Sequence, residues 1–122
     1  FYYVSLNLLY IIQNNQECNF FYNYISMDKK TEKELYADVM QSLIEHLQKR
    51  NDVQNIDLMN LSGFCRNCLS KWYVSAAEKR NLNVNYEEAR ELIYGIPYSD
   101  WKKKYQTEAT MEQLEKLKEN SD

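Results

Sequence analysis

Residues 63–73 read Gly-Phe-Cys-Arg-Asn-Cys-Leu-Ser-Lys-Trp-Tyr and place a Cys-x-x-Cys pair at the start of an amphipathic pattern. From residue 62 to residue 80, apolar side chains recur with a period near 3.6, which predicts a helix. The predicted apolar face consists of Phe64, Cys65, Cys68, Leu69, Trp72, Tyr73, Ala76 and Ala77. Both thiols are therefore expected to point towards a core, with Trp72 deeply buried at the centre of this face.

A second apolar stripe precedes the motif and predicts a helix over residues 32–50. Thr31 and Glu34 have the spacing of a capping box that would begin this helix. Its stripe consists of Leu35, Val39, Met40, Leu43, Ile44 and Leu47. An isolated helix of this length is marginal in water, so the stripe needs partners, and Leu43 is expected to be deeply buried.

The remaining elements are also predicted to be helical. Residues 51–62 are too apolar for a free loop, which favours a packed turn or a short helix opened by Asp57. A further helix begins at Asn85 and ends at Gly95, Pro97 opens a short helical segment, and Thr110 begins a last one. The sequence therefore predicts an all-α fold, a compact bundle of four to five short helices in one domain over residues 27–118, followed by a tail over residues 119–122.

Composition narrows the class of protein. With two glycines and one proline in 122 residues, turn signals are too few for a many-stranded β fold. The formal net charge of −3 gives no basic footprint for nucleic acid and no polybasic patch for a membrane. Three cysteines do not make a secreted disulfide framework, so we expect a cytoplasmic protein.

Residues 1–26 differ in composition from the rest of the chain. They contain no Lys or Arg and one acid, Glu17, and are rich in aromatic residues and Asn. The apolar run over residues 6–12 is too short to span a bilayer, and no basic region precedes it, which disfavours a membrane anchor or a signal peptide. An extra element docking on the domain is a further alternative. We expect a disordered or non-native extension, and a chain beginning at Met27 should fold as well as the whole.

Three stretches resemble one known family. They are residues 63–73, residues 86–98, which read Tyr-Glu-Glu-Ala-Arg-Glu-Leu-Ile-Tyr-Gly-Ile-Pro-Tyr, and residues 101–106, which read Trp-Lys-Lys-Lys-Tyr-Gln. The chain from about residue 31 to 114 resembles the small, mainly proteobacterial family called domain of unknown function 1244. The resemblance implies an all-helical compact domain and no assigned activity. The family's Cys-x-x-Cys is intact here as Cys65 and Cys68.

The Cys-x-x-Cys pair allows three interpretations. Three residues along a helix separate two Cα atoms by about 5 Å, within disulfide range, and the start of a helix, with Arg66 nearby, favours a thiolate. A redox dithiol is therefore reasonable, although such chemistry normally follows a strand. If the first two predicted helices pack antiparallel, His46 approaches Cys65 and Cys68, which together suit zinc, with Glu45, Asp57 or water completing the set. Both cysteines can instead be core filler, and His46 a packing residue.

Other candidate sites are weaker. The aromatic residues Trp72, Tyr73, Tyr86, Tyr94, Tyr98, Trp101 and Tyr105 suit a core, a ligand pocket or an interface. Lys102, Lys103 and Lys104 have the pattern of a solvated face, and Glu87, Glu88 and Glu91 that of a capped helix start. The sequence thus predicts an uncharacterised small binding or scaffolding protein with a metal at Cys65, Cys68 and His46. The alternatives are a thiol redox protein or thiol enzyme that uses the cysteines, and a structural module that forms a homodimer through its aromatic faces.

Overall fold

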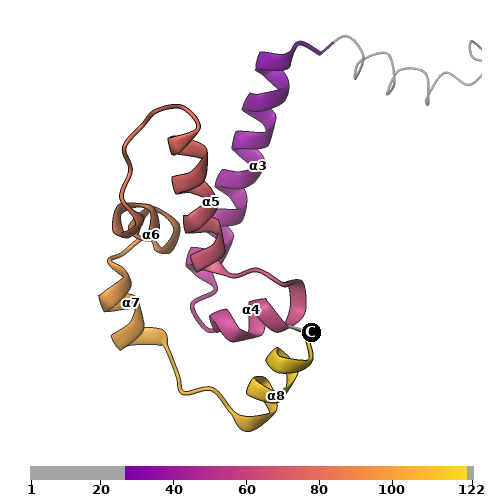
Figure 1. Cartoon of the computed structure of the whole chain (residues 1–122), viewed down its shortest axis with the longest axis vertical. Coiled ribbons are helices and arrows are strands. Elements are labelled where there is room, and N and C mark those ends of the chain that lie inside the picture. Colours follow the sequence, from indigo (N-terminus) through magenta and orange to yellow (C-terminus); the bar gives the residue numbers. More distant parts are fainter. Residues whose placement is uncertain (1–26, 121–122) are drawn as a thin grey trace, which may run out of the picture. The chain divides into compact units, whose positions relative to one another are not determined.

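The computed structural model describes residues 27–120, and this part of the chain is all-α (Figure 1). Six helices are described and no strand: α3 (Lys29–Lys49), α4 (Asn55–Ser62), α5 (Arg66–Glu78), α6 (Tyr86–Tyr94), α7 (Tyr98–Tyr105) and α8 (Met111–Glu119). The predicted fold class is confirmed. The predicted number of helices, four to five, is too low, because residues 51–62 contain the short helix that was one of the two alternatives there.

Contacts between residues group the chain into two units, residues 1–40 and residues 41–122, and each is described by itself. The predicted extension over residues 1–26 lies outside the described residues, as do the alternatives of a membrane anchor, a signal peptide and a docking element. The boundary at Met27 stays a prediction. Within residues 27–120, none of the helices combines the length and the apolar character needed to cross a bilayer.

The first unit contains the beginning of α3, which is capped by Asp28. The Asp28 carboxylate accepts hydrogen bonds from the backbone N–H groups of Lys30 and Thr31, each 2.9 Å long, and from the Thr31 hydroxyl. The predicted capping box of Thr31 and Glu34 is therefore wrong. Asp is as good a cap as Thr and occurs three residues earlier, so the helix begins there.

The apolar stripe of α3 is only partly buried. Ile44 and Leu47 are buried and Leu43 is half-buried, whereas Leu35, Val39 and Met40 are exposed. The prediction of a deeply buried Leu43 is thus too strong. A stripe identifies the apolar face of a helix but not how much of its length is covered.

Gly63 separates α4 from α5, and the sequence pattern predicted that α5 begins near residue 62 instead of at Arg66. The φ of Gly63 is +75°, a left-handed conformation, and its N–H donates to the Met59 carbonyl, which ends α4. Cys65 is extended and Arg66 is the first residue of α5. Asp57 does not cap α4 but lies in its first turn, where its carboxylate accepts a hydrogen bond from the Gln54 N–H.

The helices after the motif begin and end as predicted. Asn85 caps α6 and exchanges hydrogen bonds with Glu88, and Gly95, with a φ of +77°, ends that helix. Pro97 precedes α7, and Thr110 caps α8 together with Gln113. These local signals place the helix ends without help from tertiary structure.

The core of the second unit joins three helices. Ile44 and Leu47 of α3, Leu69 of α5 and Ile93 of α6 form one buried apolar cluster. Helix α5 packs against α6, α6 against α7, and α4 against α8. Trp101 of α7 is also buried, with its ring 5.0 Å from that of Tyr94. The start of α5 is therefore held between α3, α4 and α6.

Helix α5 buries only part of the predicted face, together with two polar residues outside it. Its buried residues are Arg66, Leu69, Ser70 and Ala77. Trp72 is 55% exposed and only stacks beside Phe64, so the prediction of a deeply buried Trp72 is wrong. The apolar pattern did not predict the buried face correctly, because two of its four buried side chains are polar and a stripe of apolar residues does not include them.

Candidate functional site

The two cysteines of the motif lie together at the start of α5. Cys65 is the residue before the helix and Cys68 is in its first turn, and their Sγ atoms are 3.8 Å apart. Both thiols are free; Cys65 is buried and Cys68 is half-buried. The Cys68 thiol also contacts the Met59 sulfur at 3.9 Å. The predicted proximity of the two thiols is therefore present, and Cys68 is the more accessible one.

The surroundings of Cys65 disfavour its thiolate. Burial raises the pKa of the Cys65 thiol, and this effect outweighs the backbone N–H groups of Cys68 and Asn67, which lower it. The sequence-based expectation was that the helix start and Arg66 would favour a thiolate. Burial opposes them, because the protein interior solvates an anion less well than water does. At neutral pH, Cys65 is therefore a poor nucleophile.

His46, the third predicted metal ligand, is an exposed residue in the last turn of α3. Within residues 27–120, no three side chains of His, Cys, Asp or Glu gather in a way that could hold a metal ion. The described structure brings together Cys65 and Cys68 only, so a metal site there would need further ligands, and metal binding stays a prediction.

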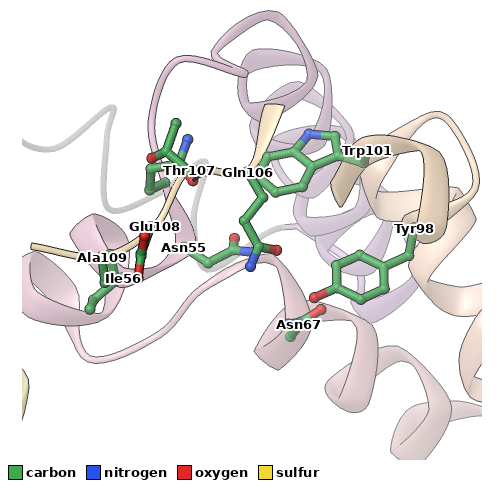
Figure 2. Close-up of a pocket in the computed structure, with 10 residues that line it drawn as sticks. Asn55, Ile56, Asn67, Tyr98, Trp101, Gln106, Thr107, Glu108 and Ala109 are labelled. Carbon is green, nitrogen blue, oxygen red and sulfur yellow. Dashed lines mark hydrogen bonds between the residues drawn. The ribbon is translucent and has the colours of Figure 1, made fainter. Parts of the chain in front are cut away.

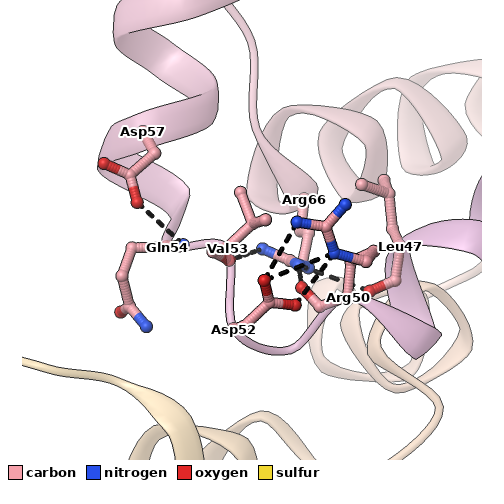
Figure 3. Close-up of polar contacts among 7 residues, drawn as sticks. All are labelled: Leu47, Arg50, Asp52, Val53, Gln54, Asp57 and Arg66. Carbon is pink, nitrogen blue, oxygen red and sulfur yellow. Dashed lines mark hydrogen bonds and ion pairs between the residues drawn. The ribbon is translucent and has the colours of Figure 1, made fainter.

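Between the cysteines, Arg66 is the most connected side chain of the motif (Figure 3). It is 1% exposed, and its guanidinium donates to the backbone carbonyls of Leu47 at 3.3 Å, Arg50 at 2.7 Å and Val53 at 2.8 Å. It also donates to the Asn55 side chain at 3.2 Å and lies 5.1 Å from the centre of the Trp101 ring. Arg66 therefore ties α5 to the end of α3 and to the turn before α4.

Asn67 extends this polar network to α6. The Tyr94 hydroxyl donates to the Asn67 side-chain oxygen at 2.9 Å and accepts from the Asn55 amide at 2.8 Å. Burial raises the pKa of Tyr94 far above its ordinary value, so the hydroxyl keeps its proton. The sequence analysis missed Asn55, Arg66, Asn67 and Tyr94 as a group, since their link is tertiary. The only available signal was the pair of polar residues enclosed by the two cysteines.

A pocket of about 380 Å³ lies beside this network (Figure 2). Its walls come from the start of α4, the start of α5, one face of α7 and the segment that follows α7. The lining residues are Gln54, Asn55, Ile56, Asn67, Tyr98, Trp101, Gln106, Thr107, Glu108 and Ala109. Two of the aromatic residues considered from the sequence as core or pocket residues, Tyr98 and Trp101, are thus pocket-lining.

The remaining predicted candidates lie elsewhere. Lys102, Lys103 and Lys104 are exposed, as expected of a solvated face. The Glu88 carboxylate accepts a hydrogen bond from the N–H of the cap residue Asn85, and Glu87 pairs with Arg90. These groups do not reach the two thiols or the network of Arg66.

Comparison with known proteins agrees with the resemblance seen in the sequence. A comparison with curated proteins gives no match. The family described as "Protein of unknown function (DUF1244)" matches residues 53–119, which include the cysteine motif, the polar network from Val53 onwards, and all helices from α4 to α8. The match covers more than half of the chain, so this protein belongs to the DUF1244 family.

Proposed function

We propose that the protein is a small thiol protein in which Cys65 and Cys68 cycle between a dithiol and a disulfide. The observation that supports this best is the 3.8 Å separation of two free sulfurs at the start of α5. A disulfide needs its sulfurs about 2.05 Å apart, so a small movement of either side chain suffices. Unlike a metal site, this chemistry needs no third ligand.

The reaction proceeds by thiol–disulfide exchange with a small-molecule disulfide of the glutathione class. One thiolate of the protein attacks that disulfide, forms a mixed disulfide and releases the first small thiolate. The second thiol of the protein loses its proton, attacks the protein sulfur of the mixed disulfide and releases the second small thiolate. The protein loses two protons and two electrons, and the small disulfide is reduced to two thiols.

Cys68 makes the first attack. It is half-buried, whereas Cys65 is 6% exposed and has a raised thiol pKa. A thiol that is buried and protonated reacts slowly with an external disulfide. It can still resolve a neighbouring mixed disulfide, because the reacting sulfurs are then already in contact.

The test uses a Cys18→Ser background, which leaves Cys65 and Cys68 as the only thiols. The protein is equilibrated in glutathione buffers of different ratios, and its free thiols are counted by alkylation and mass spectrometry. In the oxidising buffers both thiols should disappear together, and the protein mass should show no attached glutathione. A Cys65→Ala variant should accumulate one glutathione at Cys68, and a Cys68→Ala variant should stay largely unmodified while folded.

Two results would contradict the proposal. One is the absence of an internal disulfide at every glutathione ratio that keeps the protein folded by circular dichroism. The other is a folded Cys68→Ala variant whose Cys65 reacts as fast as Cys68 does in the Cys65→Ala variant. The second result would reverse the order of attack.

Zinc binding is the second candidate, because the same sulfur separation suits it. Two thiolates on one tetrahedral zinc ion lie about 3.8 Å apart, since each zinc–sulfur bond is about 2.3 Å long. Elemental analysis of protein purified without a His-tag tests this. Stoichiometric zinc that is lost in a Cys68→Ser variant supports it, and zinc-free protein with two titratable thiols argues against it.

We also propose a cytoplasmic location and a homodimer. A cytoplasmic location fits the dithiol, because cytosolic thiols are kept reduced. The homodimer is supported by the exposure of Trp72 and Tyr73, which are 55% and 43% exposed. Sedimentation analysis over a range of protein concentrations would detect such a dimer, and a concentration-independent monomer would exclude it.

A further inference from the structure

We propose that the pocket lined by α4, α5, α7 and the segment over residues 106–109 binds a small uncharged amino-heterocycle of nucleobase size. The inference is independent of thiol chemistry at the motif. The volume of about 380 Å³ falls at the lower end of the range for small-molecule sites, about 300–1,000 Å³. The ligand must therefore be small.

One side of the pocket offers hydrogen-bond donors. The Asn67 side-chain oxygen is occupied by the Tyr94 hydroxyl, so its NH₂ group is what remains for a ligand. The Tyr98 hydroxyl points towards Asn67 in Figure 2, and within residues 27–120 it makes no hydrogen bond. Together they suit a carbonyl or ring-nitrogen acceptor on the ligand.

The other side offers an acceptor between apolar side chains. In Figure 2, Glu108 lies with Ile56 and Ala109 across the pocket from Tyr98 and Asn67. Glu108 is exposed and has no ion-pair partner in the described part of the chain. A carboxylate accepts hydrogen bonds but cannot donate them, so it suits an amino group on the ligand. The apolar neighbours suit the faces of a flat ring.

Charge excludes anions from this pocket. Its ten lining residues include no Lys, Arg or His, and Glu108 contributes the only formal charge. The nearby guanidinium of Arg66 is buried and already donates to four oxygen atoms. A phosphate or carboxylate would face Glu108 without a counter-ion.

The pocket is held in shape before a ligand arrives. Asn55 and Asn67 are both fixed by the Tyr94 hydroxyl, and Asn55 also by Arg66. On the opposite wall, the Gln54 side chain donates to the Tyr105 carbonyl at 2.8 Å and accepts from the Thr107 N–H at 3.1 Å. Pre-organised groups lose little conformational entropy on binding, which favours affinity for a small ligand.

The test titrates the full chain with three free pyrimidines and follows binding by NMR shifts and calorimetry. Cytosine carries an amino group on C4 and a carbonyl acceptor on C2, uracil has a second carbonyl in place of the amino group, and orotate carries a carboxylate. We expect cytosine to bind about tenfold or more tighter than uracil, since the lost bond is to a charged group. Orotate should not bind.

Two variants locate the site. Asn67→Asp keeps an acceptor for Tyr94 but replaces the NH₂ donors, and Glu108→Ala removes the carboxylate from an exposed position. Each should weaken cytosine binding about tenfold or more. Glu115→Ala, an exposed carboxylate outside the pocket, is the matched control and should leave binding unchanged.

Three outcomes would overturn the proposal. Cytosine shows no binding at millimolar concentration, or uracil or orotate binds as tightly as cytosine, or Glu108→Ala binds cytosine like the unaltered protein. Because Asn67→Asp changes the buried network, its result counts only with an unchanged thermal midpoint. Glu108→Ala needs no such condition, since its side chain makes no hydrogen bond or ion pair within the described residues.

Discussion

Replacing Arg66 with Met tests whether the residue between the cysteines holds the fold together. Met is unbranched and apolar, so the variant keeps an apolar stem in place of the Arg methylene groups but lacks the guanidinium and cannot donate hydrogen bonds. The change removes the Arg66 hydrogen bonds from the carbonyls of Leu47, Arg50 and Val53 and from the Asn55 side-chain oxygen. The Leu47 and Arg50 carbonyls still accept from the backbone N–H groups of Arg50 and Val53.

The expected loss follows from these four bonds. A typical hydrogen bond contributes about 1 kcal/mol net, so four bonds give about 4 kcal/mol in the free energy of unfolding. Bonds from a charged donor are stronger, which raises the figure, whereas relief of the cost of burying Arg66 lowers it. Small domains have about 5–15 kcal/mol in total, so the variant should be much weakened but can still fold.

The assay is urea denaturation followed by helical circular dichroism, with Arg80→Met as the matched control. Arg80 is exposed and its guanidinium donates to one carbonyl of its own helix end, that of Ala76. The free energy of unfolding of the Arg80→Met control should fall by less than about 1 kcal/mol. If Arg66→Met also loses less than about 1 kcal/mol, the hydrogen bonds of Arg66 do not stabilise the fold and the reasoning is refuted.

Further predictions concern packing, backbone and pH. Trp72→Ala should cost about 1 kcal/mol or less, because the side chain is 55% exposed, whereas Ile93→Ala in the core should cost about 2–5 kcal/mol; urea denaturation measures both. Gly95→Ala should cost about 1–2 kcal/mol by the same assay, because φ is +77° and the new Cβ would lie 3.0 Å from Gln48 Cδ. Because the pKa of Cys65 is raised by burial, the folded state holds this proton more tightly than the unfolded state. Stability should therefore be intact below the unfolded thiol pKa and fall as pH rises through the folded value, and a Cys65→Ala variant should lose this dependence in thermal melts.

Helix ends in this protein were predictable where the signal is local. The capping pair of Asn85 and Glu88, and the left-handed Gly95, act within a few residues and need no tertiary partner. The beginning of α3 was predicted wrongly because two capping signals compete, and the earlier one, Asp28, takes the helix start. Gly63 was a local signal too, but the apolar pattern that continues across it led to a predicted start of α5 near residue 62 instead of at Arg66.

The buried face of α5 could not be predicted from apolar periodicity. Ser70 is completely buried and its hydroxyl donates to the Arg66 carbonyl one turn earlier, so its polar group is satisfied inside the helix. Arg66 is satisfied by carbonyls at the end of another helix. A sequence shows neither compensation, so it assigns both residues to the surface and places Trp72 in the core instead.

In the candidate site, the proximity of the two cysteines could be predicted from the sequence, whereas the position of His46 could not. Two cysteines three residues apart on a helix must be neighbours whatever the fold, and their sulfurs are 3.8 Å apart. The approach of His46 depended on how two helices pair and on which face of α3 turns inward. His46 is exposed, and the apolar stripe beside it does not predict which helix covers α3 or which residues at the edge of the stripe are buried.

The four residues of the motif therefore divide into two kinds. Arg66 and Asn67 are committed to the fold, through bonds to α3, the turn before α4, and Tyr94 of α6. Cys65 and Cys68 make no such long-range hydrogen bond, and beyond their mutual contact Cys68 reaches only the soft sulfur of Met59. The framework thus fixes the first turn of α5 without using either thiol. The sulfurs can therefore change oxidation state while the hydrogen bonds of Arg66 keep the helix in place. For this reason we expect Arg66→Met to lose stability in urea denaturation, and Cys68→Ala to lose reactivity with glutathione.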